Sequence, residues 1–228
     1  MRLYINERLV RRNSLLGKIL TWGGLGIVVG SVVISLQSPT ELNPYVFGGF
    51  LGVFATQFGT LLTNRWGRRP RLDEYIGDAL KGLDDRFALF HYLLRADHAL
   101  FTPNGIFALI PRTEEGVISF QEGKWLQLRE KRGFLRRGGT REIPALDRQA
   151  QSGAKKLQRS LSKSFPGETL PDVQPILVFL HTEANVQVQD SLHPALHVKK
   201  LKAWLRRLPK SKGLTRDQID DLARSSGF

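Results

Sequence analysis

Two long runs without a charged residue constrain this chain more than any other feature of its sequence. Residues 19–40 contain no Asp, Glu, Lys or Arg, and a second such run covers residues 42–64. A helix of about 20 apolar residues crosses the hydrocarbon core of a bilayer, which is about 30 Å thick. Both runs are apolar around their whole circumference, which is atypical of the amphipathic helices of soluble proteins. The sequence therefore predicts two transmembrane helices.

The segment between the two runs indicates how they are connected. Residues 37–44 contain two prolines and several polar residues, which favour a turn outside the hydrocarbon. A cleavable signal peptide is the competing interpretation, but the second run and the lack of a small-residue cleavage site argue against it. We expect a two-helix transmembrane hairpin over residues 19–66. Its small-residue pairs, Gly26 with Gly30 and Gly48 with Gly52, suit close helix packing, either within the hairpin or between molecules.

Basic residues flank the hairpin on both sides and predict its orientation. The lead-in, residues 1–18, holds five basic side chains against Glu7, and four arginines follow the second run between residues 65 and 71. Cytoplasmic flanks of membrane helices carry an excess of Lys and Arg. The sequence therefore predicts a membrane protein with two spans and with both termini in the cytoplasm.

The chain after the hairpin has the pattern of an α/β domain. The sequence of 228 residues is 41% hydrophobic, which is enough for a core. Turn residues separate the apolar runs between residues 97 and 128, which predicts a β-meander of hairpin-linked strands there. Glu122-Gly123 suits a two-residue hairpin. The other expected elements are helices over 73–83, 144–164, 198–205 and 215–225, strands over 87–94, 186–188 and 196–198, and a central strand over 175–181.

Composition adds two constraints on function. Cysteine is absent, which excludes disulfides, thiolate metal sites and cysteine nucleophiles. The formal net charge of +13 predicts a polyanionic partner, either nucleic acid or anionic lipid. Basic side chains after the meander and on the helix over 144–164 are the expected contacts. They are Lys131, Arg132, Arg136, Arg137, Arg141, Lys155, Lys156 and Arg159.

The stretch from residue 97 to residue 125 resembles the nuclease-related domain NERD, a distant relative of the PD-(D/E)XK nucleases. Asp97-His98 opens a strand, Asn104-Gly105 forms a turn before an aliphatic strand, and Gly116 precedes another hairpin. The resemblance implies a PD-(D/E)XK nuclease-like α/β fold over residues 72–208. Residues 209–228 are expected to form a C-terminal helical tail, because Thr215-Arg216-Asp217-Gln218 has the pattern of a capping box.

The resemblance also implies which residues line the site. They are Asp97, Glu74 on the opening helix, Arg112 on the second strand, and Gln149 and Gln151 on a later helix. In the usual NERD pattern the second strand ends in Glu-x-Lys.

This chain departs from that pattern where a nuclease would hold its metal ion. Ile110 stands at the position of the glutamate and Arg112 at that of the lysine. A nuclease of this type needs two carboxylates to hold Mg²⁺, and Ile110 cannot ligate a metal ion. A guanidinium stays protonated and replaces a tunable amine poorly. Glu114 or Glu115 would have to supply the missing carboxylate from the loop.

The histidines do not change this interpretation. Only His193 and His197 have a close ligand spacing, which would require a helix that Pro194 disfavours. The sequence therefore predicts no metal site and no cofactor, with Mg²⁺ only if a loop acid has replaced the missing ligand.

Three functions follow from these observations. The first is a membrane-anchored, cytoplasm-facing NERD-like domain with a degenerate active site, which acts by binding and has weak, non-specific affinity for nucleic acid. The second is an active Mg²⁺-dependent nuclease with a migrated metal ligand. The third is a membrane scaffold whose basic face meets anionic lipid.

The predicted topology is tested with reporters fused after Phe228. We expect a cytoplasmic signal, because basic residues flank both spans. We also expect the protein to stay in the membrane fraction after a high-salt wash, because apolar helices and not surface charge hold it there. An external signal would contradict the topology, and release by salt would contradict the anchoring.

Overall fold

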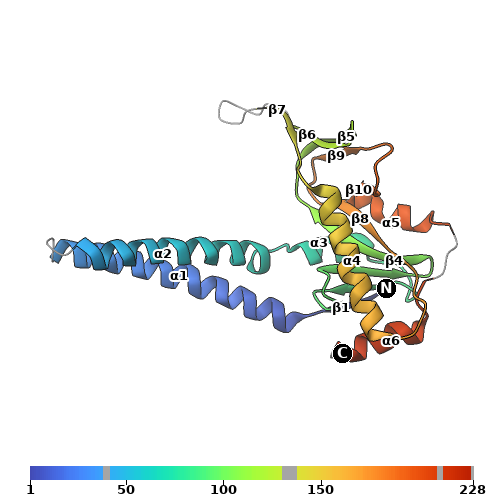
Figure 1. Cartoon of the computed structure of the whole chain (residues 1–228), viewed down its shortest axis with the longest axis horizontal. Helices are drawn as coiled ribbons and strands as arrows, with labels where there is room; N and C mark the ends of the chain where they lie inside the picture. Colours follow the sequence, from blue (N-terminus) through green and yellow to red (C-terminus); the bar gives the residue numbers. More distant parts are fainter. Residues whose placement is uncertain (38–41, 130–137, 210–212, 227–228) are drawn as a thin grey trace. The chain divides into compact units, whose positions relative to one another are not determined.

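The computed structural model describes residues 1–37, 42–129, 138–209 and 213–226 (Figure 1). The chain divides into two compact units. Unit 1 comprises Met1–Ile5 and Leu72–Phe228, and unit 2 comprises Asn6–Arg71. The residues that precede and follow the helical unit therefore belong to the same unit.

Unit 2 is a pair of helices. It contains α1 (Glu7–Gln37), α2 (Leu42–Leu62) and a π-helical turn, η1 (Thr63–Gly67). Two helical stretches, beginning at Glu7 and Val46, are long and apolar enough to cross a membrane. Large apolar side chains such as Trp22 and Phe47 are exposed on this unit, as expected for helices that contact lipid.

Small residues let α1 and α2 approach closely. Gly17, Gly24 and Ser31 recur every seven residues along the buried face of α1. A Cβ atom added to Gly24 would lie 2.6 Å from the carbonyl oxygen of Gly52, and one added to Gly59 would lie 2.3 Å from the amide nitrogen of Thr21. The two backbones are therefore in contact at these positions, where any side chain would force them apart.

The two small-residue pairs differ in their surroundings. Gly48 and Gly52 face α1, with Gly48 against the Ser31 hydroxyl. Gly26 and Gly30 face open space, since a Cβ added to either would meet no atom within 4 Å in the described part of the chain. Packing within the hairpin thus accounts for Gly48 and Gly52 but not for Gly26 and Gly30.

Unit 1 is built on a six-stranded sheet in the order β1-β2-β3-β4-β8-β10. The antiparallel strands β2, β3 and β4 form its middle, and β1, β8 and β10 each run parallel to their neighbour. The strands are β1 (Arg2–Ile5), β2 (Ala88–His91), β3 (His98–Thr102), β4 (Gly105–Arg112), β8 (Val173–Phe179) and β10 (Ala195–His197). The α/β class predicted from the sequence is confirmed.

Helices cover both faces of this sheet (Figure 1). Leu100, Phe107 and Leu109 pack in one core cluster with α3 (Leu72–Leu80) and α5 (Val198–Arg206). Phe101, Ile106 and Ala108 pack in another with α4 (Leu146–Ser164) and α6 (Arg216–Ser225). The alternation follows from strand geometry, because successive side chains point to opposite faces.

The segment expected as a β-meander is divided between two sheets. The second sheet has the order β7-β6-β5-β9, comprising β7 (Gly139–Glu142), β6 (Lys124–Arg129), β5 (Gly116–Gln121) and β9 (Ala184–Gln187). The prediction that β4 and β5 form a hairpin was wrong. The end of β4 pairs with β8 and β5 pairs with β9, so long-range parallel pairing replaces the local one. The Glu122-Gly123 hairpin is confirmed, with φ of +50° and +75° at its two residues.

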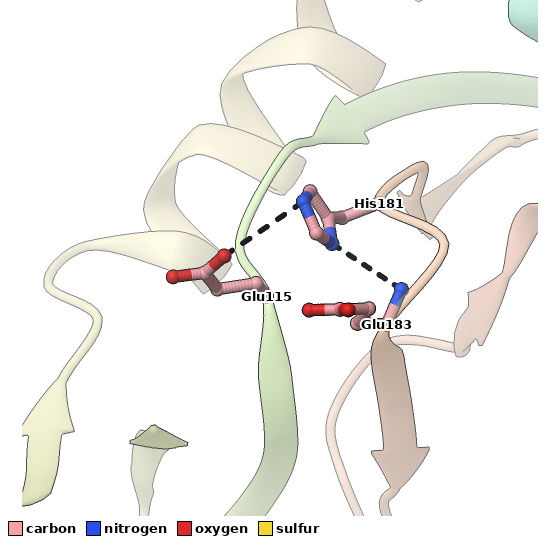
Figure 2. A group of neighbouring side chains, drawn as sticks. All are labelled: Glu115, His181 and Glu183. Carbon is pink, nitrogen blue, oxygen red and sulfur yellow. Dashed lines mark hydrogen bonds and ion pairs between the residues drawn. The ribbon is translucent and has the colours of Figure 1, made fainter. Parts of the chain in front are cut away.

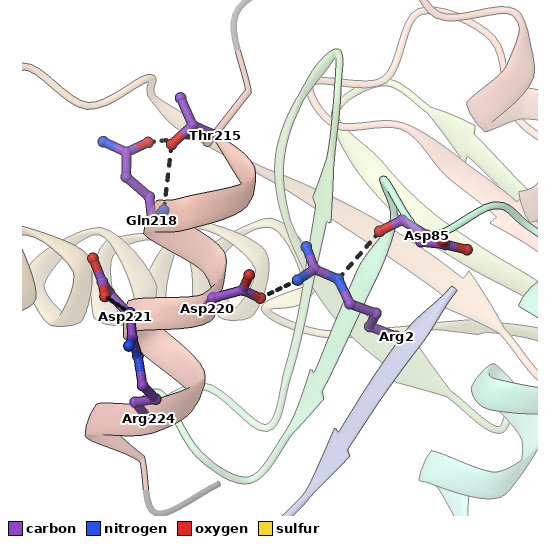
Figure 3. Close-up of polar contacts among 7 residues, drawn as sticks. All are labelled: Arg2, Asp85, Thr215, Gln218, Asp220, Asp221 and Arg224. Atoms are coloured by element: carbon purple, nitrogen blue, oxygen red, sulfur yellow. Dashed lines mark hydrogen bonds and ion pairs between the residues drawn. The ribbon is translucent and has the colours of Figure 1, made fainter.

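Both ends of the chain are tied into unit 1. The Arg2 amide donates to the Phe87 carbonyl (2.9 Å), its Nε donates to the Asp85 carbonyl (3.1 Å), and its guanidinium pairs with Asp220 of α6 (Figure 3). The lead-in expected over residues 1–18 therefore divides between β1 and the first turns of α1. The segment expected as a tail, 209–228, contributes buried side chains of α6 to the core.

The central strand predicted over residues 175–181 is β8, which lies inside the sheet between β4 and β10. Its residues Ile176 to Phe179 are fully buried, with an exposed fraction of 0% at Phe179. The continuous apolar run thus marks a strand covered on both faces, as expected.

Engineered disulfides test the packing of unit 2, because the chain has no cysteine of its own. A Cβ on Gly48 would lie 3.6 Å from that of Ser31, within the range of about 3.5–4.5 Å that disulfides need. We expect Ser31→Cys/Gly48→Cys to form an intramolecular disulfide under mild oxidation, seen as a mobility shift that reductant reverses. The control pair Gly30→Cys/Gly49→Cys, at positions that face open space, should not. Equal oxidation of both pairs would contradict the helix register.

Candidate functional site

The candidate site lies where β4 and β8 end. These strands are parallel, so their carboxyl ends meet at one edge of the sheet. Arg112 ends β4 and is followed by Glu114 and Glu115, whereas His181 and Glu183 follow β8. Two groups of polar side chains result, one around Arg112 and one around His181.

Ile110, which the NERD resemblance aligns with a metal-binding glutamate, packs as a core residue. It is half-buried against a cluster that includes Leu146 of α4 and Phe179. A Cβ added to Gly153 of α4 would lie 2.6 Å from the Cδ1 atom of Ile110. The glycine therefore makes room for the isoleucine, and the surroundings of residue 110 are apolar.

Arg112 is held by two partners. Its Nε donates to Glu114 Oε2 (3.1 Å), and a second guanidinium nitrogen contacts Glu114 Oε1, which makes a bidentate ion pair. Its third nitrogen donates to Gln149 Oε1 on α4 (2.7 Å). The side chains of Arg112 and Glu114 are only 19% and 17% exposed. Glu114 thus neutralises the charge of Arg112.

The other residues implied by the resemblance have different surroundings. Continuing the β3–β4 register by two residues sets Asp97 level with Ile110, and Asp97 is exposed. Glu74 lies in the first turn of α3, which covers the face of the sheet opposite α4. Gln151 lies two residues further along α4 and is rotated by about 200° from Gln149, so only Gln149 reaches Arg112.

The second group comprises Glu115, His181 and Glu183 (Figure 2). Within the described residues, these are the three acidic or imidazole side chains close enough together to hold a metal ion, with ligand atoms within 4.8 Å of one another. His181 Nε2 lies 3.8 Å from Glu115 Oε2, and Arg129 Nε lies 3.7 Å from Glu115 Oε1. The sequence analysis named Glu115 as a possible metal-binding acid but missed His181 and Glu183, although a His-x-Glu at the end of a buried strand was a usable signal.

The basic residues predicted to bind polyanions are described in part. Lys155, Lys156 and Arg159 are exposed on α4, and Arg141 is exposed on β7. The remaining four lie outside the described residues: Lys131, Arg132, Arg136 and Arg137. The α4 residues form the basic face that the structure describes.

A cavity of about 390 Å³ lies near the amino end of β4, away from this edge. Arg2, Pro103 and Leu214 help to line it, as do Asp84 and Arg86. Arg86 donates to the Asp84 carboxylate (2.7 Å) and lowers the pKa of that carboxyl. Acidic and basic side chains thus both line this cavity, so it is not strongly basic.

A buried histidine pair is a further feature that the sequence did not reveal. The Nδ1 atoms of His91 on β2 and His98 on β3 are 2.6 Å apart, and both side chains are buried. One ring must donate and the other accept, so the pair accommodates a single proton between these atoms. It is a cross-strand contact inside the core.

Residues 97 and 110, which the resemblance aligns with two metal-binding acids, are an aspartate and an isoleucine and so supply one carboxylate. Acid side chains are present nearby, but Glu114 is engaged by Arg112 and Glu115 lies with His181. No family model matches the chain, and neither a curated protein nor a solved structure matches it.

A double-mutant cycle tests the packing of Ile110. Gly153→Ala should stabilise the folded protein by up to about 1 kcal/mol through helix propensity. The steric clash between the new Cβ and Ile110 should cancel that gain in stability. In an Ile110→Ala background the contact is gone, so the same change should stabilise the protein. We expect a coupling of about 0.5–1 kcal/mol or more in the free energy of unfolding of the full chain in detergent.

Gly77→Ala on α3 is the matched control for this cycle. Its Cβ would meet only Leu3 at 4.0 Å, so its effect should be the same in both backgrounds. If Gly153→Ala also had the same effect in both, Ile110 would not pack on α4 as described.

Proposed function

We propose that the chain is a membrane-anchored protein whose unit 1 is a NERD-like, catalytically degenerate domain that binds polyanions, with nucleic acid as the principal ligand. The observation that carries the proposal is the packing of Ile110 against Gly153 at the position of a metal-binding acid. A nuclease-like domain with a packed isoleucine in place of a metal ligand keeps a surface that binds nucleic acid but cannot hold the metal ion that hydrolysis needs.

The loss of one carboxylate weighs heavily against hydrolysis. Mg²⁺ must be held near the scissile phosphate and is bound through carboxylates. Asp97 and Ile110 lie at the same level of the sheet, where a nuclease would hold two acids. Arg112 adds a fixed charge that cannot act as a base and that Glu114 already neutralises.

The exposed lysines and arginine of α4 support binding to phosphates. Lys155, Lys156 and Arg159 point away from the buried stripe of Ala154, Leu157 and Leu161. Flexible, exposed cations release counterions when they meet a phosphate backbone, which gives affinity without sequence preference. This chemistry fits weak, non-specific binding.

The connectivity of the chain supports the anchoring and its topology. β1 precedes α1 and pairs with β2, which follows α2, so both ends of unit 2 return to one folded domain. If each apolar helix crosses the bilayer once, the chain crosses twice and both ends of the helical unit lie on the same side. The basic residues on both flanks favour the cytoplasm for that domain.

The test uses the full chain, because β1 belongs to unit 1 and a fragment starting at Leu72 would lack it. The protein is reconstituted in phosphatidylcholine nanodiscs and titrated with a DNA duplex by fluorescence anisotropy. We expect weak binding that falls steeply between about 50 and 200 mM salt. Replacing Lys155, Lys156 and Arg159 by Gln should lower the salt slope by up to about one unit for each lost phosphate contact.

The control is the double variant Lys199→Gln/Lys200→Gln on α5, which removes exposed charge from the opposite face of the sheet and should leave the slope unchanged. Binding to separate phosphatidylserine vesicles without measurable DNA binding would replace nucleic acid with lipid as the ligand. Mg²⁺-dependent cleavage that Asp97→Ala abolishes would contradict the degenerate site.

A further inference from the structure

We propose that Glu115, His181 and Glu183 form a binding site for a divalent transition-metal ion, with Zn²⁺ as the best fit. The site is distinct from the Asp97 and Ile110 positions and does not depend on the proposed nucleic acid binding. It joins the loop after β4 to the loop after β8, and so connects the two sheets of unit 1 (Figure 2).

The spacing of the ligand atoms fits an ion after small side-chain movements. The three atoms lie within 4.8 Å of one another, and Glu115 Oε2 is 3.8 Å from His181 Nε2. Two ligands on a tetrahedral Zn²⁺, each at about 2.0–2.2 Å, are about 3.4 Å apart. Glu183 is exposed and the other two side chains are partly exposed, so torsional adjustment closes the difference.

The backbone of the site is fixed by contacts from three directions. Gly116, next to Glu115, has φ of +85°, and a Cβ there would lie 2.3 Å from the Leu128 carbonyl oxygen. The buried Gln127 side chain donates to the Glu115 carbonyl (2.7 Å), and the Gly116 amide donates to the Glu183 carbonyl (3.2 Å). The ligands thus project from loops that are already held together, which lowers the entropic cost of binding.

The turn after β8 is equally well defined. The Ala184 amide donates to the His181 carbonyl (2.9 Å) and closes the turn that carries two of the ligands. His197 accepts at Nδ1 from the Lys199 amide, so its Nε2 carries the proton and donates to the same carbonyl (3.0 Å). These bonds position His181 without using its ring.

The ligand types select the ion. One imidazole nitrogen with two carboxylates suits Zn²⁺ and its first-row neighbours, whereas Mg²⁺ and Ca²⁺ prefer oxygen ligands alone. Three protein ligands leave a position for water, as in open zinc sites.

Two features limit the affinity. The Glu183 amide donates to His181 Nδ1 (3.2 Å), so in the metal-free protein the proton lies on Nε2 and faces Glu115. An ion at Nε2 requires that proton to move to Nδ1, which exchanges the Glu183 hydrogen bond for the metal bond. Arg129 also competes for Glu115, although its side chain is 44% exposed and the pair is weak in water.

The test measures metal binding by the full chain in detergent micelles after removal of any histidine tag. Isothermal titration with Zn²⁺ should show one saturable site, and Co²⁺ should give visible absorption bands of an ion in a low-symmetry N/O site. Glu115→Gln and His181→Ala should each weaken Zn²⁺ binding by about tenfold or more, since even the partners that orient metal ligands contribute about that much. Mg²⁺ should bind more weakly than Zn²⁺.

Matched variants away from the site separate it from adventitious binding. His193→Ala and the hairpin-tip change Glu122→Gln should leave Zn²⁺ affinity and the Co²⁺ bands unchanged. If His181→Ala proves unfolded by circular dichroism, Glu183→Gln at the exposed ligand takes its place. The absence of saturable binding, binding unaltered by the ligand variants, or tighter binding of Mg²⁺ than of Zn²⁺ would overturn the proposal.

Discussion

The parallel pairing of β1 with β2 is the constraint on which the rest of the structure depends. Arg2 lies opposite Ala88 and Ile5 opposite His91, so four residues before the helical unit complete a sheet formed by residues after it. Parallel neighbours need a crossover connection, and here the crossover contains α1, α2 and α3. Any membrane crossing by the helical unit must therefore return the chain to the side it left. The ion pair between Arg2 of β1 and Asp220 also ties the first strand to the last helix, α6.

Local patterns in the sequence predicted where helices and strands lie better than which strands pair with each other. The apolar runs located both long helices and the buried strand β8, and Glu122-Gly123 located a hairpin, because these features depend on neighbouring residues alone. β1 was missed because four residues beside a basic stretch carry no periodic signal, and their pairing energy comes from a distant strand. The β4–β5 hairpin was predicted wrongly for the related reason that β8 and β9 supply better partners from far along the chain.

Only the part of the site whose side-chain directions follow from strand alternation could be predicted from the sequence. Ile110 and Arg112, two residues apart, both point towards α4, where they meet Gly153 and Gln149. The group around His181 depends instead on the parallel alignment of β4 and β8, which sets two loops side by side. Of the residues implied by the family resemblance, Arg112 and Gln149 are in contact, whereas Glu74 lies in the first turn of a helix on the other face of the sheet. Placing these loops required the sheet order, which local sequence patterns do not contain.

The charges at this edge explain how binding of a polyanion and of a metal ion would influence each other. Arg112 is satisfied by Glu114, so a phosphate that approached it would have to displace a bidentate carboxylate. The α4 cations lack that cost, which makes them the better phosphate contacts. Glu115 and Glu183 meanwhile place negative charge on the same edge, where Arg112 donates to Gln149 in the first turn of α4. A divalent ion on that pair would cancel charge that repels phosphate, and by linkage each ligand would then raise the affinity of the protein for the other.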